Sequence, residues 1–566
     1  MAAGKTPSEL AEAISERLAQ YLKDPKVTVT LVSGLGDLRQ QIRVVGDVDQ
    51  PSAIPYRSGM TLLDAVIQTG GLSRQADGNG AVIVRETDGL TREIPVRLAD
   101  LVRQGDVTAN VALEPGDVIV IPEGFFEGEW TIEHGVSMSQ TVSDNIDQDP
   151  DGERTVGFIT RAGPNVAISG KTARVVATLN ADMAGVTQFG GDNEGFTVDP
   201  NLAGSSTSEL SPDLLFFDLN ASITRQIMDS RDATSASGAS TENRDVVAAF
   251  TASPYVLHRL ADFADVEWRY RVSPVLVDSN DNSNVLSQEG SLILDSGDDF
   301  SLMNWTFSNN VGHELRTDEG DITTAKTDLG IGYPLWRGFS LIGGIGYEYR
   351  DGDQDEDFNF DGVTWRGGFQ WDPNPDLSMQ ATYGRRDDDD NLDASLRYQV
   401  GPKTEVHASY TESLESSQGR AISGLGQPDN DPDPDPFSFD DETTRTRIVI
   451  LRGSHNNGQD TFGLSGLAGK SDGGTDGDED FYNATITWRR ALGRDLSLDT
   501  SAGYDYSDFK EDDRRDDTYR VNLGLTYRLY SNAQAFASYG FEKRDSSRSD
   551  DSYYENAATV GLSLSF

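Results

Sequence analysis

The chain has 566 residues, room for roughly two to four ordinary domains, and 94 acidic against 47 basic side chains give it a formal net charge of −47. This charge excludes nucleic acid as a partner and docking onto anionic lipid through a polybasic face. The absence of cysteine excludes disulfides, thiolate metal sites and a cysteine nucleophile. Glycine and aromatic residues are plentiful although hydrophobic residues make up only 36%, which favours many short strands over a helical globule.

The first residues predict an amphipathic helix. Thr6 can cap it, Pro7 stands at the first helical position, and Glu9 fills the capping-box position. Apolar residues then recur at helical spacing, at Leu10, Ile14, Leu18 and Leu22. The opening has neither the basic start nor the apolar core of a secretion signal, so we expect that an upstream part is missing. Residues 27–32 alternate in polarity and predict a strand.

Residues 34–123 predict a small α/β domain. Its segments of regular pattern are strands at 41–48, 81–85, 93–96 and 118–121, a helix at 61–68 and a helical turn at 99–104. The segment with Pro51 and Pro55 predicts a loop between the first strand and the helix. A helix on one face of returning strands is typical of a β-grasp-like domain.

These residues resemble two parts of the polysaccharide export (Wza-like) family. Residues 1–33 are similar to the second half of its export domain, and residues 34–123 are similar to its soluble-ligand-binding β-grasp (SLBB) repeat. The similarity is carried by turn and core positions: 4–10, 23–27, 45–48, Pro51, 59–62, Ala65, 70–72 and 115–119. The resemblance implies a fold and an export role, and it supplies no catalytic motif. A β-grasp adaptor that binds protein rather than sugar stays an open alternative for this head.

A linker at 124–130 leads into residues 131–566, where segments of roughly 10–16 residues alternate in polarity between turns. In the last segment one face carries Tyr554, Ala558, Val560, Leu562, Leu564 and Phe566. Such a pattern fits a half-buried soluble sheet or a transmembrane barrel. Three features favour the barrel: aromatic residues flank the apolar face, short and long connections alternate, and Phe566 ends the chain on that face.

The expected fold is therefore mainly β, with a small α/β head followed by a large antiparallel transmembrane barrel of about 22 strands, an even number within roughly 18 to 22. The segments near 131–141 and 199–210 are the least regular of these strands. Residues 161–165, 173–179 and 213–223 resemble the start of barrel proteins found with exosortase-linked exopolysaccharide systems.

The polar face of the expected strands supplies the candidate lumen residues. Charged side chains alternate there with small polar residues, at Asp499, Asp505, Arg520, Arg528, Glu542 and Glu555. A mixed polar wall can pass a hydrated polymer through water-mediated contacts, although each residue taken alone is better explained as solvated lumen wall.

Acidic runs lie in the expected outer loops, where they must be solvated. Asp147, Asp149 and Asp151 reproduce the front half of an EF-hand calcium loop, but the twelfth position holds Phe158 instead of Glu. Weak Ca²⁺ or Mg²⁺ binding in this loop is the one metal expectation, and no other cofactor is expected. The proline-rich loop 413–441 is expected to be stiff and disordered.

The leading hypothesis is outer-membrane export of capsular polysaccharide or exopolysaccharide, with the head docking the secretion machinery from the periplasm and the barrel forming the exit. The alternative is an anchor, with a plugged barrel and a head that holds polysaccharide or partner proteins. The expected partners are polysaccharide, inner-membrane or periplasmic export components, lipopolysaccharide, outer-membrane lipid and the barrel assembly machinery. An enzyme is disfavoured because no G-x-S-x-G motif is present and paired carboxylates such as Asp499 and Asp505 are too common here to be specific.

Overall fold

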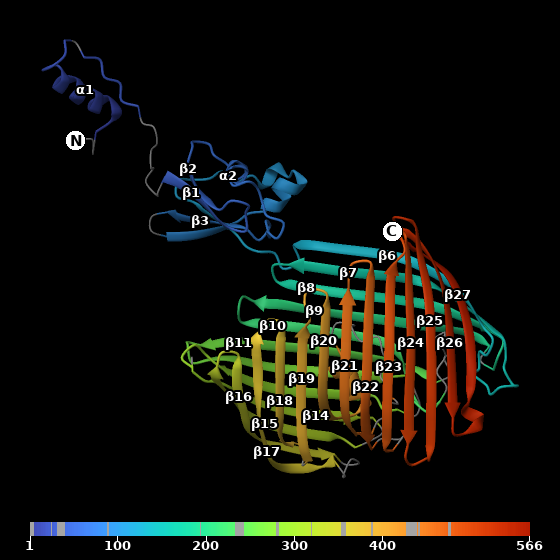
Figure 1. The fold of residues 1–566 in the computed structure, drawn as a ribbon. Coiled ribbons are helices and arrows are strands. Elements are labelled where there is room, and N and C mark those ends of the chain that lie inside the picture. The colour runs from blue at the N-terminus through green and yellow to red at the C-terminus, as the bar shows by residue number, and fades with distance from the viewer. Residues whose placement is uncertain are drawn as a thin grey trace. The chain divides into compact units, whose positions relative to one another are not determined.

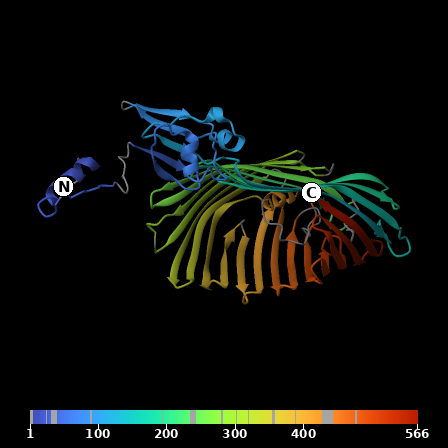
Figure 2. The same ribbon diagram turned by 90° about the horizontal axis from the view of Figure 1, so that it is seen from above.

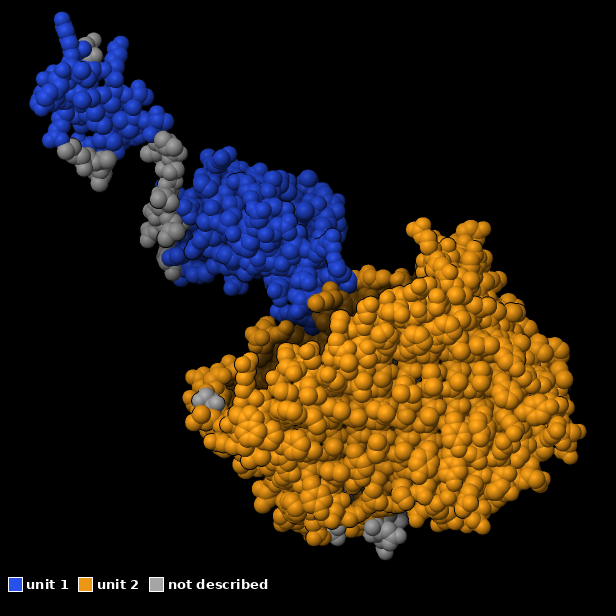
Figure 3. Space-filling model, viewed as in Figure 1, with its two compact units in different colours: residues 1–129, 172–174 blue, residues 130–171, 175–566 orange. Residues whose placement is uncertain are grey.

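The computed structural model forms two compact units, residues 1–129 with 172–174 and residues 130–171 with 175–566 (Figure 3). It describes residues 5–23, 25–30, 40–87, 90–192, 194–232, 243–278, 282–300, 302–317, 320–352, 358–386, 389–425, 439, 442–473 and 477–566. In this part of the chain, no helix has the length and apolar character needed to cross a membrane.

The predicted N-terminal helix is confirmed as α1, Pro7–Leu18. Its capping box is complete, because the Thr6 side chain accepts from the Glu9 N–H and the Glu9 carboxylate accepts from the Thr6 N–H at 2.8 Å. No α1 residue is buried. The strand predicted over 27–32 is wrong for the described residues 25–30, which hold no strand; residues 31 and 32 lie outside the described part.

The rest of the N-terminal unit is a five-stranded mixed sheet with strand order β2-β1-β5-β3-β4 (Figure 1). Its elements are β1 Gln41–Gly46, β2 Ser52–Pro55, α2 Leu62–Gln68, β3 Val82–Thr87, β4 Leu90–Pro95, η2 Asp100–Gln104, η3 Val107–Ala109 and β5 Val118–Ile121. The expected loop around Pro51 and Pro55 is in fact the edge strand β2, which a proline tolerates because one side of an edge strand needs no N–H donor.

One buried ion pair ties β3 of this sheet to the turn before β5. The guanidinium of Arg85 holds the Asp117 carboxylate through two bonds of 2.8 Å, and that carboxylate also accepts from the Glu114 N–H at 2.8 Å. The Asp117 side chain is 1% exposed, so this network rather than water satisfies its charge.

Within the described residues, 22 antiparallel strands close into a barrel, as predicted (Figure 1). The strands are β6 Gly128–Ser143, β7 Gly157–Thr172, β8 Val175–Phe189, β9 Gly195–Ser211, β10 Leu215–Ile227, β11 Arg244–Leu260, β12 Ala264–Val277, β13 Val285–Ser296, β14 Asn304–Arg316, β15 Ile322–Trp336, β16 Phe339–Gly352, β17 Phe360–Asn374, β18 Leu377–Arg386, β19 Asp389–Gln399, β20 Thr404–Glu415, β21 Thr444–Asn456, β22 Asp460–Asp472, β23 Glu479–Ala491, β24 Leu496–Phe509, β25 Arg514–Tyr530, β26 Ala533–Ser546 and β27 Tyr553–Ser565. The last strand pairs with the first, with Ser565 opposite Gly135, so the sheet has no free edge.

The connections differ in length between the two rims. One rim carries the start of β6, the end of β27 and turns of two to four residues, apart from 297–303. The other rim carries the long connections, including 144–156, 228–243 and 416–443. Outer-membrane barrels have short periplasmic turns and long outer loops, so the chain enters and leaves this barrel at the periplasmic rim.

Alternation along the strands separates an apolar outside from a polar inside. On β25 the side chains of Tyr519, Leu523, Leu525, Tyr527 and Leu529 are 43–49% exposed and face outward. Those of Arg514, Asp516 and Thr518, on the opposite face, are 3–8% exposed. An outward apolar face flanked by tyrosines is the surface that a lipid bilayer requires.

Candidate functional site

The sequence-predicted lumen residues share the inward face of β24 to β27. Register places Arg520 opposite Glu542, and Glu542 opposite Glu555, so the three form one row across β25, β26 and β27. Arg520 Nε lies 3.2 Å from Glu542, and the Tyr553 hydroxyl donates to the same carboxylate at 2.5 Å. Glu555 accepts from the Ser143 hydroxyl at 2.7 Å across the strand pair that closes the barrel.

The two glutamates of this row are buried inside the protein. Glu542 is 1% exposed and Glu555 is 0% exposed. A buried carboxylate needs a cation or hydrogen-bond donors, and Arg520 with Tyr553 and Ser143 supply them. The row therefore stabilises, on the inner face, the strands β25, β26 and β27 next to the point where the barrel closes.

Of the other three predicted lumen residues, Asp505 contacts this row, whereas Asp499 and Arg528 do not take part in it. Asp505 pairs with Arg520 at 2.5 Å, whereas Asp499 pairs with Arg489 and is 41% exposed. Arg528 is exposed and lies on the inward face near the periplasmic end of β25. The structure thus joins Arg520, Glu542 and Asp505 in one ion-paired network. Glu555 lies beside Glu542 in register, and Asp499 and Arg528 lie outside the network.

Further charged pairs and one aromatic stack line the inner wall. Asp199 of β9 pairs with Arg161 of β7 at 2.6 Å and with Arg225 of β10 at 3.2 Å. Phe216 stacks on Tyr255 with ring centroids 5.1 Å apart, and Arg269 lies 3.8 Å above the Tyr255 ring. Such a wall offers charges already neutralised in pairs, together with stacked aromatic rings.

The three aspartates predicted as a weak calcium loop do not converge. Asp147 accepts from the Asp192 N–H at 3.0 Å, and burial raises the pKa of its carboxyl group. Asp151 lies 3.6 Å from Arg154. Among the residues that the structure describes, no group of three or more His, Cys, Asp or Glu side chains is arranged to hold a metal ion.

The first part of the connection between β20 and β21 folds into the barrel. The loop 413–441 was expected to be disordered, but its residues 417–423 form helix α3, Ser417–Ser423, which contacts β11 and β12 as well as β20 (Figure 2); residues 426–438, 440 and 441 lie outside the described part of the chain. The apolar seat that holds it comprises Val247, Ala249, Val275, Val277 and Val285 on the wall, with Phe439, Ala421, Ile422, Leu425 and Met228 packed on them. Burial of these apolar side chains holds α3 and Phe439 against the wall.

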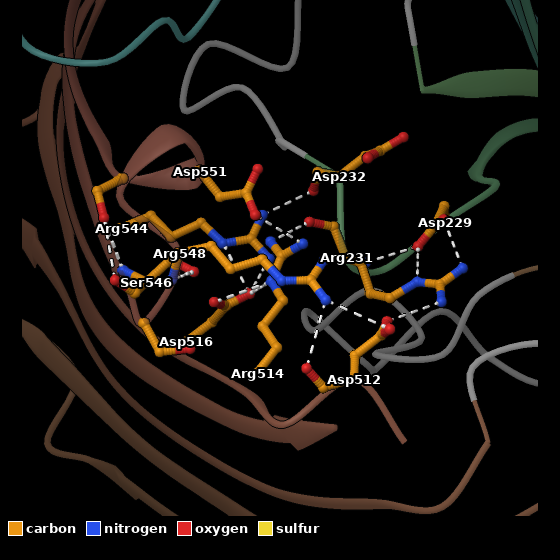
Figure 4. Close-up of polar contacts among 12 residues, drawn as sticks. Asp229, Arg231, Asp232, Asp512, Arg514, Asp516, Arg544, Ser546, Arg548 and Asp551 are labelled. Atoms are coloured by element: carbon orange, nitrogen blue, oxygen red, sulfur yellow. Dashed lines mark hydrogen bonds and ion pairs between the residues drawn. The ribbon is translucent and has the colours of Figure 1, made fainter. Parts of the chain in front are cut away.

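The residues that directly follow β10 reach the wall of β25 and β26. We call residues 228–232 the strap, and Arg514, Asp516 and Arg544 the latch (Figure 4). Arg514 Nη2 donates to the Arg231 carbonyl at 2.6 Å, and Arg544 Nη1 donates to the Asp232 carbonyl at 2.9 Å. Strands β26, β27, β6, β7, β8 and β9 separate β10 from β25 around the barrel, so these bonds cross the mouth of the lumen.

Sequence reasoning missed the strap, the latch and the α3 insertion. The apolar residues Ile422, Leu425 and Phe439 within an otherwise polar connection were the available signal for the insertion. No local pattern marks Arg514 and Arg544, because their partners are distant in sequence.

Comparison with known families assigns the parts of the chain. Residues 40–121 match the family model of the SLBB domain, residues 1–32 that of "Polysaccharide biosynthesis/export protein", and residues 479–566 that of "Putative beta-barrel porin 2". The chain is also similar to the "EPS I polysaccharide export outer membrane protein EpsA" of Ralstonia nicotianae, with 31% identity over 122 residues, and to that of Ralstonia solanacearum, with 31% over 118 residues. Each match covers 21% of this chain and only 30% of the relative.

Solved structures with a similar fold include the FrpB iron transporter from Neisseria meningitidis and the siderophore receptor PirA from Acinetobacter baumannii. Their TM-scores are 0.45 and 0.46, at 10% and 8% identity, and each match covers 80% of this chain and 85% or 82% of the other. The barrel and the export-family matches assign the chain to the outer membrane, with its SLBB domain in the periplasm.

Proposed function

We propose that this protein exports a capsular polysaccharide or an exopolysaccharide across the outer membrane, with the barrel as the exit pore. The observation that carries the proposal is that one chain joins an SLBB domain and an export-family segment directly to a closed 22-strand barrel. A barrel with this number of strands has room for a wide lumen. The paired charges and the Phe216–Tyr255 stack give that lumen a hydrogen-bonding, polymer-compatible wall.

The head, in this proposal, docks the inner-membrane or periplasmic components of the export machinery. The predicted domain limits serve here as the working division: residues 1–33 and 34–123 for the head, 124–130 for the linker and 131–566 for the barrel. Lipopolysaccharide and outer-membrane lipid would surround the barrel, and the barrel assembly machinery would insert it.

Secretion of polysaccharide by a deletion strain tests the export proposal. We expect the strain to lose surface polysaccharide, and complementation with the full chain to restore it. A complementing chain with Gly46→Trp should keep the barrel but disrupt the pairing of β1 with β5 in the head. The reason is that a Cβ at residue 46 would lie 2.0 Å from the Ile121 carbonyl oxygen. Restored barrel levels without secretion would show that the head is needed, and unchanged secretion in the clean deletion would refute export.

An anchoring function is the second candidate, and the occupied mouth of the barrel favours it. Helix α3 and the strap both lie across the lumen, as parts of a plug would. Conductance of the purified full chain in a planar bilayer separates the two functions. A permanently silent barrel supports the anchor, whereas channels that polysaccharide blocks support export.

A further inference from the structure

The strap and the α3 insertion form one layer at the extracellular mouth. The N–H of Phe439 donates to the Ile227 carbonyl at 3.2 Å, at the point where β10 passes into the strap. Met228, the first strap residue, packs in the apolar seat of α3, and Asn282 Nδ2 lies 3.7 Å from its sulfur. The apolar seat therefore holds one end of the strap, and the latch holds the other.

The two ends of the strap are held by different kinds of contact. At the seat, apolar side chains are buried against β11, β12 and β13. At the latch, the strap contributes backbone carbonyl groups that accept hydrogen bonds from two guanidinium groups. Arg231 adds a contact of 3.3 Å with Asp512, which is partly exposed. Water can hydrogen-bond to the freed carbonyl and guanidinium groups once the strap leaves the latch, but it cannot replace the apolar contacts of the seat.

The latch keeps its own charge balance without the strap. Arg514 Nε lies 3.0 Å from Asp516 and Nη1 lies 3.0 Å from Asp551, while Arg544 also pairs with Asp516. The side chains of Arg514, Arg544 and Asp516 are only 3–7% exposed. Release of the strap would therefore leave a paired, rehydrated cluster on the wall, with no unpaired buried charge.

The strap also carries its own internal structure. The Asp229 carboxylate accepts from the N–H of Arg231 at 2.8 Å and from its Nε at 3.0 Å. Asn243, at the start of the return to β11, accepts from the Asp229 N–H at 2.9 Å. Because these contacts are local, the strap can leave the latch without losing its own turn.

We propose that the strap is an extracellular gate, fixed at the α3 seat and opened by release from the latch of Arg514, Asp516 and Arg544. This inference rests on the proposed export function, which supplies the polymer that the gate would let out. In the closed state the strap and α3 cross the mouth, and release of the latch frees the side of the lumen next to β24 to β26.

Reversible cross-linking tests the gate in the full chain. The protein has no cysteine, so the variant Arg231→Cys/Asp512→Cys carries only two thiols, one on the strap and one on the opposite wall. A short bifunctional methanethiosulfonate reagent should hold the gate closed and lower the conductance at least tenfold, and reductant should restore it. The matched control is Asp480→Cys/Lys510→Cys, an ion pair of 2.8 Å on the same rim that does not cross the lumen.

The outcomes separate the gate from the export proposal. The gate is overturned if the conductance is the same with and without the cross-link across the mouth, or if the control variant loses as much conductance. In either case, secretion in cells can still support export. Conductance that follows the cross-link in a protein whose deletion leaves secretion intact supports the gate and refutes export. The purified variants are compared for heat-modifiable migration on gels, which identifies any variant whose barrel has not folded.

Discussion

Replacement of Arg514 by lysine should open the barrel without unfolding it. Arg514 donates from three nitrogens, to Asp516, to Asp551 and to the Arg231 carbonyl of the strap. Lysine keeps the positive charge beside Asp516, but its single ammonium group cannot reproduce the planar fork that reaches all three acceptors. We therefore expect Arg514→Lys to lose the bond to the strap and to keep the charge balance of the latch.

The expected change in the ratio of closed to open barrels follows from the environment of the bond between Arg514 and the strap. The Arg514 side chain is 5% exposed, so water screens the interaction little. A hydrogen bond from a charged donor contributes about 1.5–3 kcal/mol net, and about 1.4 kcal/mol is a factor of ten in an equilibrium constant. Loss of one such bond should shift the closed-to-open ratio by about 10- to 150-fold toward the open state.

Single-channel open probability in a planar bilayer measures this shift. Arg515→Lys is the matched control, because Arg515 is the neighbouring residue, its side chain is 62% exposed, and its Nε lies 3.5 Å from Asp508. The control should leave the open probability within about twofold of the parent, as expected for an exposed pair. An Arg514→Lys protein that folds normally and opens no more often than the control would refute the reasoning.

Three further predictions concern the head and the strap. Asp117→Asn should destabilise the SLBB domain by about 3 kcal/mol, because it removes the buried carboxylate that pairs with Arg85. Hydrogen exchange of the β5 amides during a urea titration measures this loss of stability. Gly46→Ala should cost at least about 2 kcal/mol in the same assay, because residue 46 has φ +95° and faces the Ile121 carbonyl; an unchanged midpoint would contradict this. In the closed state, burial raises the pKa of Asp232 above its ordinary value of 3.8, so closure favours the protonated carboxyl group. Ionisation of Asp232 as the pH rises therefore favours the open state. Open probability should therefore fall on acidification through that raised pKa, and Asp232→Asn should flatten this part of the profile.

The barrel was predictable because its signal is local. Alternation of polarity places Tyr519, Leu523 and Leu525 on one face of a strand whatever lies beyond it, and the closed sheet follows from repetition of that pattern. The capping box at Thr6 and Glu9 is equally local. Strand β2 was missed because prolines at 51 and 55 are typical of loops, and only pairing with β1 makes this segment a strand.

The latch was not predictable because its geometry depends on closure of the whole barrel. Arg544 and Asp232 are remote in sequence, and neither lies in a motif. The lumen row was easier, since Arg520, Glu542 and Glu555 are neighbours on consecutive strands once the register is known. Inward-facing charges can be predicted from strand alternation, but their contacts with connections that cross the lumen cannot.

The occupied mouth is compatible with export because of the size of the barrel. Porins with 16–18 strands already leave an aqueous channel, so an open barrel of 22 strands would leak small solutes across the outer membrane. A wide export pore therefore needs a closure that yields to its polymer. A permanent plug would be expected to bury apolar surface at all of its contacts, as α3 does at its seat. The strap instead meets the latch through two carbonyl groups at the rim, contacts that water can replace, and this difference favours a gate over an anchor.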